Sequence, residues 1–217
     1  MQTANRQAPL RRIVLTGGPG SGKTVVSAAI AARDPARFAL VMEAATDVYA
    51  RRQTRWDRAT LDEKRDIQRE IYRLQTEREQ AAMVNAGGRV VLLDRGTIDG
   101  AAYWPGGPAD YWRELGTTHT RELDRYDVVV WLQTAAAIGR YTGDADNSIR
   151  FEAAPEAVLA GDKLLEPALW GGHRRLLQVP ATADVEAKIR AVAALLDDLL
   201  RGSPAQSEQT GYTSGSH

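Results

Sequence analysis

The sequence predicts a three-layer α/β fold, in which helices cover both faces of a five-stranded parallel sheet. Two observations carry this prediction. Short apolar runs alternate along the chain with helical patterns, and the runs are continuously apolar, without the polar alternation of a half-exposed strand. Strands of this kind are typical of parallel sheets, because the crossover helices bury both faces.

Five runs are interpreted as strands, because each is short, rich in β-branched or leucine residues, and bounded by polar or glycine residues. In chain order they are residues 12–17, 38–43, 89–94, 127–133 and 175–180. A helix is expected from Gly22 to about Arg33, directly after the glycine-rich segment that ends the first strand.

Two further helices have readable boundaries. Thr60 and Glu63 fit a capping box at the start of a helix that Gly87 and Gly88 end. A closing helix is expected within residues 183–200, after the fifth predicted strand. The apolar positions expected to face the sheet are Ile67, Ile71, Leu74 and Ala81 in the first of these helices, and Val185, Ile189, Val192, Leu195 and Leu199 in the second.

Composition and charge limit the classes of function. The 217 residues carry 28 Lys and Arg against 28 Asp and Glu, and this zero net charge argues against nucleic acid as the main partner. The absence of cysteine excludes disulfides and thiolate chemistry. No apolar run approaches the ~20 residues of a membrane span, so a cytoplasmic protein is expected. We expect one domain over residues 10–201, with disordered tails at 1–9 and 202–217.

Residues 17–24 read GGPGSGKT and satisfy the pattern G-x-x-x-x-G-K-[ST] between a predicted strand and a predicted helix. Glycines let the backbone curl so that its N–H groups face phosphate oxygens, and the helix adds its positive end. This P-loop (Walker A) context favours a nucleotide site over a flexible glycine turn. The residues expected to bind the cofactor, Mg²⁺ with ATP or GTP, are Gly18, Pro19, Gly20, Ser21, Gly22, Lys23, Thr24 and Val25. Lys23 would bridge the outer phosphates, and Thr24 would ligate Mg²⁺.

Charged residues follow the second and third strands, where ligands of open parallel sheets bind. Asp94 is expected to hold Mg²⁺ or to accept a proton from an attacking hydroxyl. Glu43 is a candidate general base or substrate contact, with helix capping as the alternative. Arg95 would bind substrate or phosphate, with a surface ion pair equally favoured. For Asp99, substrate contact is weighed against an ordinary turn residue.

Three further segments could complete a site. Arg150, and Arg140 after it, would supply charge from a lid after the fourth strand, unless the segment merely caps a helix. Tyr103 and Trp104 belong to an aromatic loop that could line an acceptor pocket, although packing beneath the loop is favoured. Ala181 and Asp184, in the loop 180–184, could contact the nucleotide base. His119 and His173 lack metal-ligand spacing and are interpreted as structural.

With these residues identified, the chain resembles the P-loop AAA-type ATPase-like domains related to the nicotinamide riboside kinase of bacterial NAD synthesis. The resemblance covers residues 12–200 and rests on TGGPGSGKT, Glu43 with Ala44, SIRFE and VEAKI. The stretch LDRGTIDGAAYW carries most of it. The resemblance implies a nucleotide-kinase-like fold that binds Mg²⁺ with ATP or GTP. It also implies phosphate and metal roles for Lys23 and Thr24, a Walker-B role for Asp94 and a lid role for Arg150.

The resemblance leaves the acceptor open. Some relatives phosphorylate a ribonucleoside, whereas others are GTP-binding proteins that recognise phosphoinositides. The first hypothesis is therefore a kinase for a nucleoside-like or other small hydroxyl acceptor. The alternative is a nucleotide-dependent switch that binds a protein or a phosphoinositide, in which the basic run 51–58 would matter. A ring-forming motor is not favoured, since no room for a helical lid domain and no inter-subunit arginine finger is found. The sequence indicates neither the oligomeric state nor the choice between ATP and GTP.

Overall fold

The strands of the computed structural model form one parallel sheet in the order β2-β3-β1-β4-β5. The structure describes residues 10–140, 162 and 168–201, so the predicted tails and Arg150 lie outside it. The strands are β1 (Arg12–Thr16), β2 (Phe38–Val41), β3 (Val90–Asp94), β4 (Val128–Leu132) and β5 (Leu176–Val179). Each lies within a predicted run, and the predicted fold class is confirmed.

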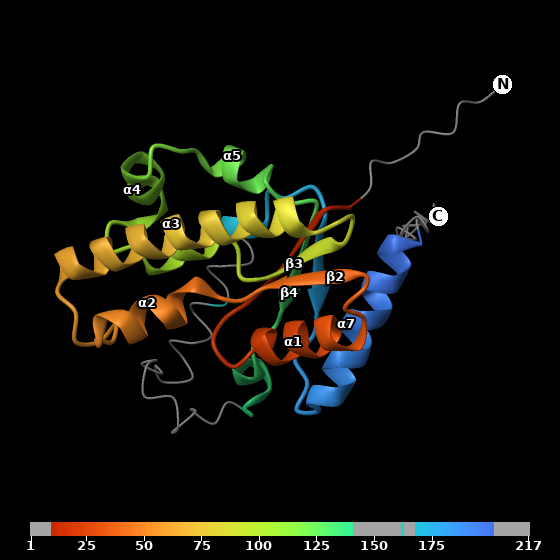
Figure 1. Cartoon of the computed structure of the whole chain (residues 1–217). Coiled ribbons are helices and arrows are strands. Elements are labelled where there is room, and N and C mark those ends of the chain that lie inside the picture. Colours follow the sequence, from red (N-terminus) through yellow and green to blue (C-terminus); the bar gives the residue numbers. More distant parts are fainter. Residues whose placement is uncertain (1–9, 141–161, 163–167, 202–217) are drawn as a thin grey trace, which may run out of the picture.

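Helices cover both faces of the sheet, as Figure 1 shows. On one face lie α1 (Lys23–Arg33) and α7 (Val185–Leu200), and on the other lie α3 (Leu61–Asn85), η1 (Thr97–Tyr103), α4 (Gly107–Glu114) and α5 (His119–Leu123). The short α2 (Ala44–Arg52) packs against α3, and η2 (Ala135–Ile138) follows β4. Among the helices that the structure describes, none combines the length and apolarity needed to cross a membrane.

The central strand β1 divides its side chains between two apolar cores. Ile13 and Leu15 are buried with residues of α1 and α7, whereas Val14 belongs to the core on the α3 side. Because β3 and β4 flank β1 in parallel, the segments that follow these three strands emerge at the same edge of the sheet. Leu15 lies opposite Asp94, so the end of β3 stands beside the segment that begins at Gly17.

The helix predictions are confirmed in part. Thr60 and Glu63 form the expected capping box, since the Glu63 N–H donates to Thr60 Oγ1 at 3.3 Å and the Thr60 N–H donates to Glu63 Oε2 at 2.7 Å. Ala81 is exposed and Val185 is 49% exposed, so the predicted apolar faces are wrong at these two positions. The aromatic segment predicted as a loop instead forms η1 and α4.

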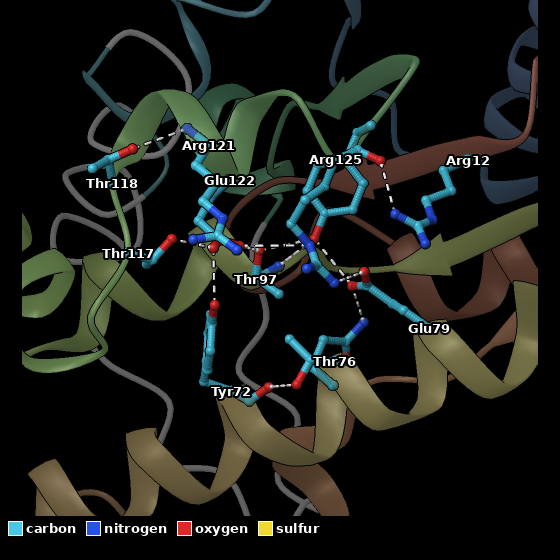
Figure 2. A network of polar contacts seen from close by, with 12 residues as sticks. Arg12, Tyr72, Thr76, Glu79, Thr97, Thr117, Thr118, Arg121, Glu122 and Arg125 are labelled. Atoms are coloured by element: carbon cyan, nitrogen blue, oxygen red, sulfur yellow. Dashed lines mark hydrogen bonds and ion pairs between the residues drawn. The ribbon is translucent and has the colours of Figure 1, made fainter.

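A polar network is buried between α3, η1 and α5 (Figure 2). Glu79 of α3 is fully buried, and its carboxylate accepts hydrogen bonds from Arg125 Nη2 at 2.6 Å and from the Tyr126 hydroxyl at 3.0 Å. Glu122 accepts from Thr97 Oγ1 at 2.7 Å. Burial raises the pKa of Tyr126 well above its ordinary value, so this phenol remains a neutral donor.

This network holds the segment that follows β3 from beneath. The Thr97 N–H donates to the Tyr126 hydroxyl at 2.8 Å, and Gln75 Nε2 donates to the Arg95 carbonyl at 3.3 Å. Helix α3 is therefore polar on part of its buried face, where an apolar stripe alone could not satisfy the backbone of residues 95–97.

We expect the substitution Glu79→Gln to destabilise the protein by about 2 kcal/mol, because Arg125 loses a charged partner while the shape of the side chain is kept. Urea denaturation measures the free energy of unfolding. The matched control is Glu77→Gln on the solvent side of the same helix, whose exposed ion pair with Arg73 is worth less than about 0.5 kcal/mol. Equal effects of the two substitutions would contradict a stabilising role for the network.

Candidate functional site

The segment between β1 and α1 is bent by glycines at positions that other residues rarely adopt. Gly17, Gly20 and Gly22 have φ angles of 138°, 70° and 83°. A Cβ atom on Gly17 would lie 2.1 Å from the carbonyl oxygen of Leu132, so β4 passes directly behind the loop. Gly22 is the N-cap of α1 and no side chain caps this end, which has no acidic residue in its first turn. Such an end favours an anion.

The side chain of Lys23 extends from the first turn of α1 back to the loop and contacts it. It is 4% exposed, and its Nζ donates to the carbonyl oxygens of Gly17 at 2.7 Å and Gly18 at 2.9 Å and to Ser21 Oγ at 3.0 Å. Its ammonium group is therefore fixed at the mouth of the curled backbone. A phosphate group placed on these N–H groups would meet a positive charge there.

Thr24 and Asp94 join the first turn of α1 to the end of β3. Thr24 Oγ1 donates to Asp94 Oδ2 at 2.6 Å. The other carboxylate oxygen, Asp94 Oδ1, is buried and has no hydrogen-bond partner among the described residues. A hydroxyl and an orphaned carboxylate oxygen are ligands suited to Mg²⁺, either directly or through water.

The described residues contain no cluster of three or more His, Cys, Asp or Glu side chains able to hold a metal. A metal at Thr24 and Asp94 would therefore complete its coordination with water and ligand oxygens. This arrangement is usual for Mg²⁺ bound with a nucleotide.

Arg95 lies at the centre of a second, charged group, which we call the arginine cluster: Arg95, Glu43 and Asp99. The guanidinium Nε lies 2.8 Å from Glu43 Oε1, and Nη1 lies 3.2 Å from Asp99 Oδ2. Asp99 also accepts from Thr16 Oγ1 at 2.8 Å and from Trp170 Nε1 at 2.7 Å. Asp99 is thus a buried residue of η1 that is tied to the arginine cluster, to β1 and to Trp170.

The buried guanidinium stays charged. Burial lowers the pKa of Arg95, but Tyr103 and the carboxylates of Asp99 and Asp94 raise it by more, so the net shift is upward. The backbone of Arg95 has a φ of 73°, which is costly for an arginine and aims the residue after β3 into the cluster. Its N–H donates to the Leu15 carbonyl at 3.0 Å, which ties the cluster to β1.

The aromatic residues predicted to contact substrate take different places. Tyr103 is half-buried, with its ring 5.8 Å from the Arg95 guanidinium carbon and edge-on to Trp56 at 6.2 Å. Trp104 is 4% exposed, packs against Tyr111 and donates to Asp110 at 2.7 Å. The structure places Trp104 in the core beneath the site, which corresponds to the packing alternative.

The residues predicted near the nucleotide base lie between β5 and α7, and one of them bonds to the residue that follows β4. The Ala181 N–H donates to Gln133 Oε1 at 3.1 Å, and Asp184 caps α7 by accepting from the Ala187 N–H at 3.0 Å. Arg140 is exposed beyond η2. These base and phosphate contacts stay predictions, as does the lid role of Arg150, which lies outside the described residues.

The two histidines make structural contacts. His119 stacks on Trp112 with 5.3 Å between ring centroids, and His173 lies 2.9 Å from the Tyr126 carbonyl oxygen. Sequence reasoning missed three side chains that contact the phosphate loop, namely those of Thr134, Asp162 and Lys188. Only Lys188 left a signal, since it is one of four lysines in the chain.

A comparison with known families identifies the family to which this chain belongs. A family model described as an AAA domain matches residues 12–188, which include the phosphate loop, Asp94 and the arginine cluster. No curated protein matches the chain. The match is to the broad family, so the resemblance to riboside kinases stays a prediction. The chain belongs to the AAA domain family of P-loop nucleotide-binding proteins.

Proposed function

We propose that this protein is a magnesium-dependent kinase that transfers the γ-phosphoryl group of ATP or GTP to a hydroxyl of a nucleoside-like or other small acceptor. The observation that carries the proposal is the arginine cluster beside the phosphate loop. Asp99 accepts a hydrogen bond from Thr16, the last residue of β1, which directly precedes the loop. Arg95 directly follows Asp94. Buried charged groups at this position are suited to orient an acceptor against a terminal phosphate.

The site divides phosphate and acceptor contacts between its two halves. Lys23 and the backbone of the loop bind the phosphates, and Thr24 with Asp94 holds Mg²⁺. The metal supplies positive charge that offsets the charge of the transferred group. Because Asp94 would hold Mg²⁺ together with Thr24, Glu43 is assigned as the base that accepts the proton of the acceptor hydroxyl. The transfer forms a phosphate ester and releases the nucleoside diphosphate.

The arginine cluster and its aromatic neighbours define the class of acceptor. Carboxylates and a guanidinium bind hydroxyl groups, and the half-buried Tyr103 with Trp56 offers ring surface to a planar group. Ribonucleosides combine both features. In the basic run 51–58, Arg51 and Arg52 pair with Glu70, and Arg55 pairs with Asp57. These pairs offset the charge that a phosphoinositide-binding switch would need, which favours the kinase.

The test is a screen for turnover that depends on an acceptor. Purified protein is given Mg²⁺ with ATP or GTP and a panel of nucleosides and other small hydroxyl compounds, and release of the diphosphate is measured. Nicotinamide riboside belongs in the panel because of the sequence resemblance. At least one acceptor should raise release well above the rate without acceptor. If none does so, the kinase proposal fails and binding to partners becomes the function to examine.

We expect Lys23→Ala to reduce turnover at least about a hundredfold, because a positioned donor to developing phosphate charge is removed. Arg73→Ala, on the exposed face of α3, is the control and should leave turnover unchanged. Circular dichroism checks that both variants keep the fold. Near-normal turnover by folded Lys23→Ala protein would contradict the assignment of the phosphate site.

Asp94→Asn should raise the Mg²⁺ concentration needed for half-maximal nucleotide binding by about tenfold or more, because one anionic oxygen near the metal is lost. Calorimetric titrations of nucleotide at increasing Mg²⁺ measure this shift. The exposed Asp198 of α7 provides the control Asp198→Asn. A Mg²⁺ dependence equal to that of the wild type would remove Asp94 from the metal site.

Glu43→Gln should separate acceptor chemistry from nucleotide binding. Turnover with the acceptor is expected to fall about a hundredfold or more, since the amide cannot take the proton, while the nucleotide Kd changes less than about twofold. Glu77→Gln is the matched control. If nucleotide affinity and turnover fell together, Glu43 would be supporting the loop and not acting as the base.

A further inference from the structure

Three successive carbonyl groups of the phosphate loop are held from outside the loop. Thr134 Oγ1 donates to the Pro19 oxygen at 2.6 Å, and the Ala135 N–H donates to the Gly20 oxygen at 3.3 Å. Lys188 Nζ donates to the Ser21 oxygen at 2.9 Å. The donors come from the segment after β4 and from α7, so two separate parts of the chain hold the loop by hydrogen bonds.

The orientation of a carbonyl fixes the orientation of the next N–H group. The carbonyl and the N–H of a trans peptide unit point in opposite directions, and the described residues contain no cis peptide bond. Holding the Pro19 and Ser21 oxygens outward therefore turns the N–H groups of Gly20 and Gly22 toward the inside of the curl. The Ser21 N–H instead donates to the Gly18 oxygen at 3.3 Å.

Lys188 is buried for a reason other than the docking of α7. Helix α7 already packs on the sheet through Ile189, Val192 and Leu196, which are at most 2% exposed. Lys188 is itself only 4% exposed, and burying an ammonium group has a desolvation cost that a methionine would avoid. Its Nζ donates hydrogen bonds to two backbone carbonyls, that of Ser21 at 2.9 Å and that of Gln133 at 3.2 Å.

Asp162 balances this charge from the other side of the loop. It is 3% exposed, and its carboxylate accepts from the Gly18 N–H at 2.6 Å and from Trp131 Nε1 and the Thr134 N–H at 3.1 Å each. Burial lowers the pKa of Lys188, and the Asp162 carboxylate opposes this effect. The loop is thus held between two buried side chains of opposite charge.

We infer that Lys188 and Thr134 are positioning residues for the phosphate groups of the nucleotide, because they hold the loop carbonyls outward and so direct the Gly20 and Gly22 N–H groups at the ligand. Lys188 also places a positive charge behind the loop, in addition to Lys23. The inference rests on the nucleotide site of the proposed function and adds residues that do not themselves touch the ligand. Gly22 is suited to this position by its φ of 83°, which favours glycine.

The experiment compares Lys188→Met with Lys64→Met, which removes the same charge from a different helix. Loss of a charge-assisted hydrogen bond that holds the loop should raise the Kd for MgATP or MgGTP roughly tenfold to a hundredfold in Lys188→Met. Lys64→Met should leave it within about twofold. Calorimetry measures both values, and thermal unfolding of the free proteins checks that each variant is folded.

A second variant and a rescue separate positioning from general stability. Thr134→Val should raise the Kd in the same direction, with the exposed Thr120→Val as its control. In Lys188→Ala, added ethylammonium should restore nucleotide affinity, whereas ethanol at the same concentration should not, because ethanol carries no charge and has a single O–H donor for the two carbonyls that Lys188 bonds. Restoration by both compounds would indicate that Lys188 only fills space and would overturn the inference.

The outcomes distinguish this inference from the proposed function. Wild-type protein that binds neither MgATP nor MgGTP would contradict the proposed function and, with it, the inference. Wild-type protein that binds tightly, alongside folded Lys188→Met that binds equally well, would contradict the inference alone. Weaker binding by both Lys188→Met and Thr134→Val, with both controls unaffected, would support it.

Discussion

The site depends on a backbone conformation that only glycine adopts readily, fixed between β1 and α1. At Gly17 any side chain would collide with the Leu132 carbonyl, so β4 sets the path of the loop from behind. The loop then ends in the uncapped first turn of α1, where helix geometry leaves N–H groups without intrahelical acceptors. In the proposed function, phosphate affinity would thus come from main-chain donors that the surrounding side chains keep oriented.

The burial of charged side chains is the second constraint on the site, and it explains why many hydrogen-bonding groups lie around the ends of β1 and β3. Lys23, Arg95, Glu43, Asp94 and Asp99 are all less than one-tenth exposed. Charged groups in such surroundings are tolerated only when each has partners. Helix α3 contacts the arginine cluster directly, because Gln75 donates to the Arg95 carbonyl and Arg78 donates to the Glu43 carbonyl. The network around Glu79 also holds the Thr97 backbone through Tyr126, and α5 joins it where Glu122 accepts from Thr97.

The fold class, the five strands and the phosphate loop could be predicted, because each depends on local patterns: apolar runs, a capping box and a glycine motif. The partners within the site could not. Asp99 resembled a turn residue, since its bonds to Thr16 and Trp170 join positions 83 and 71 residues apart in the chain. For Trp104 the sequence left a pocket role and packing both open, with packing favoured, since no pattern shows which side of an aromatic segment faces the core. Lys188 acts on Ser21 across 167 residues, a distance over which sequence spacing carries no information.

Gln133, at the end of β4, serves two parts of the site at once. Its side-chain oxygen accepts from the Ala181 N–H, in the loop predicted to meet the purine, while its main-chain oxygen accepts from Lys188 beside the phosphate loop. The segments predicted to contact the base and the phosphates of a bound nucleotide would therefore both be hydrogen-bonded to Gln133. If the 180–184 loop contacts the base as predicted, selectivity for adenine or guanine would then depend on Gln133 as well as on that loop. Redesigning that loop to exchange one purine for the other would also disturb the position of Lys188 and the phosphate loop that it holds, unless Gln133 kept its place.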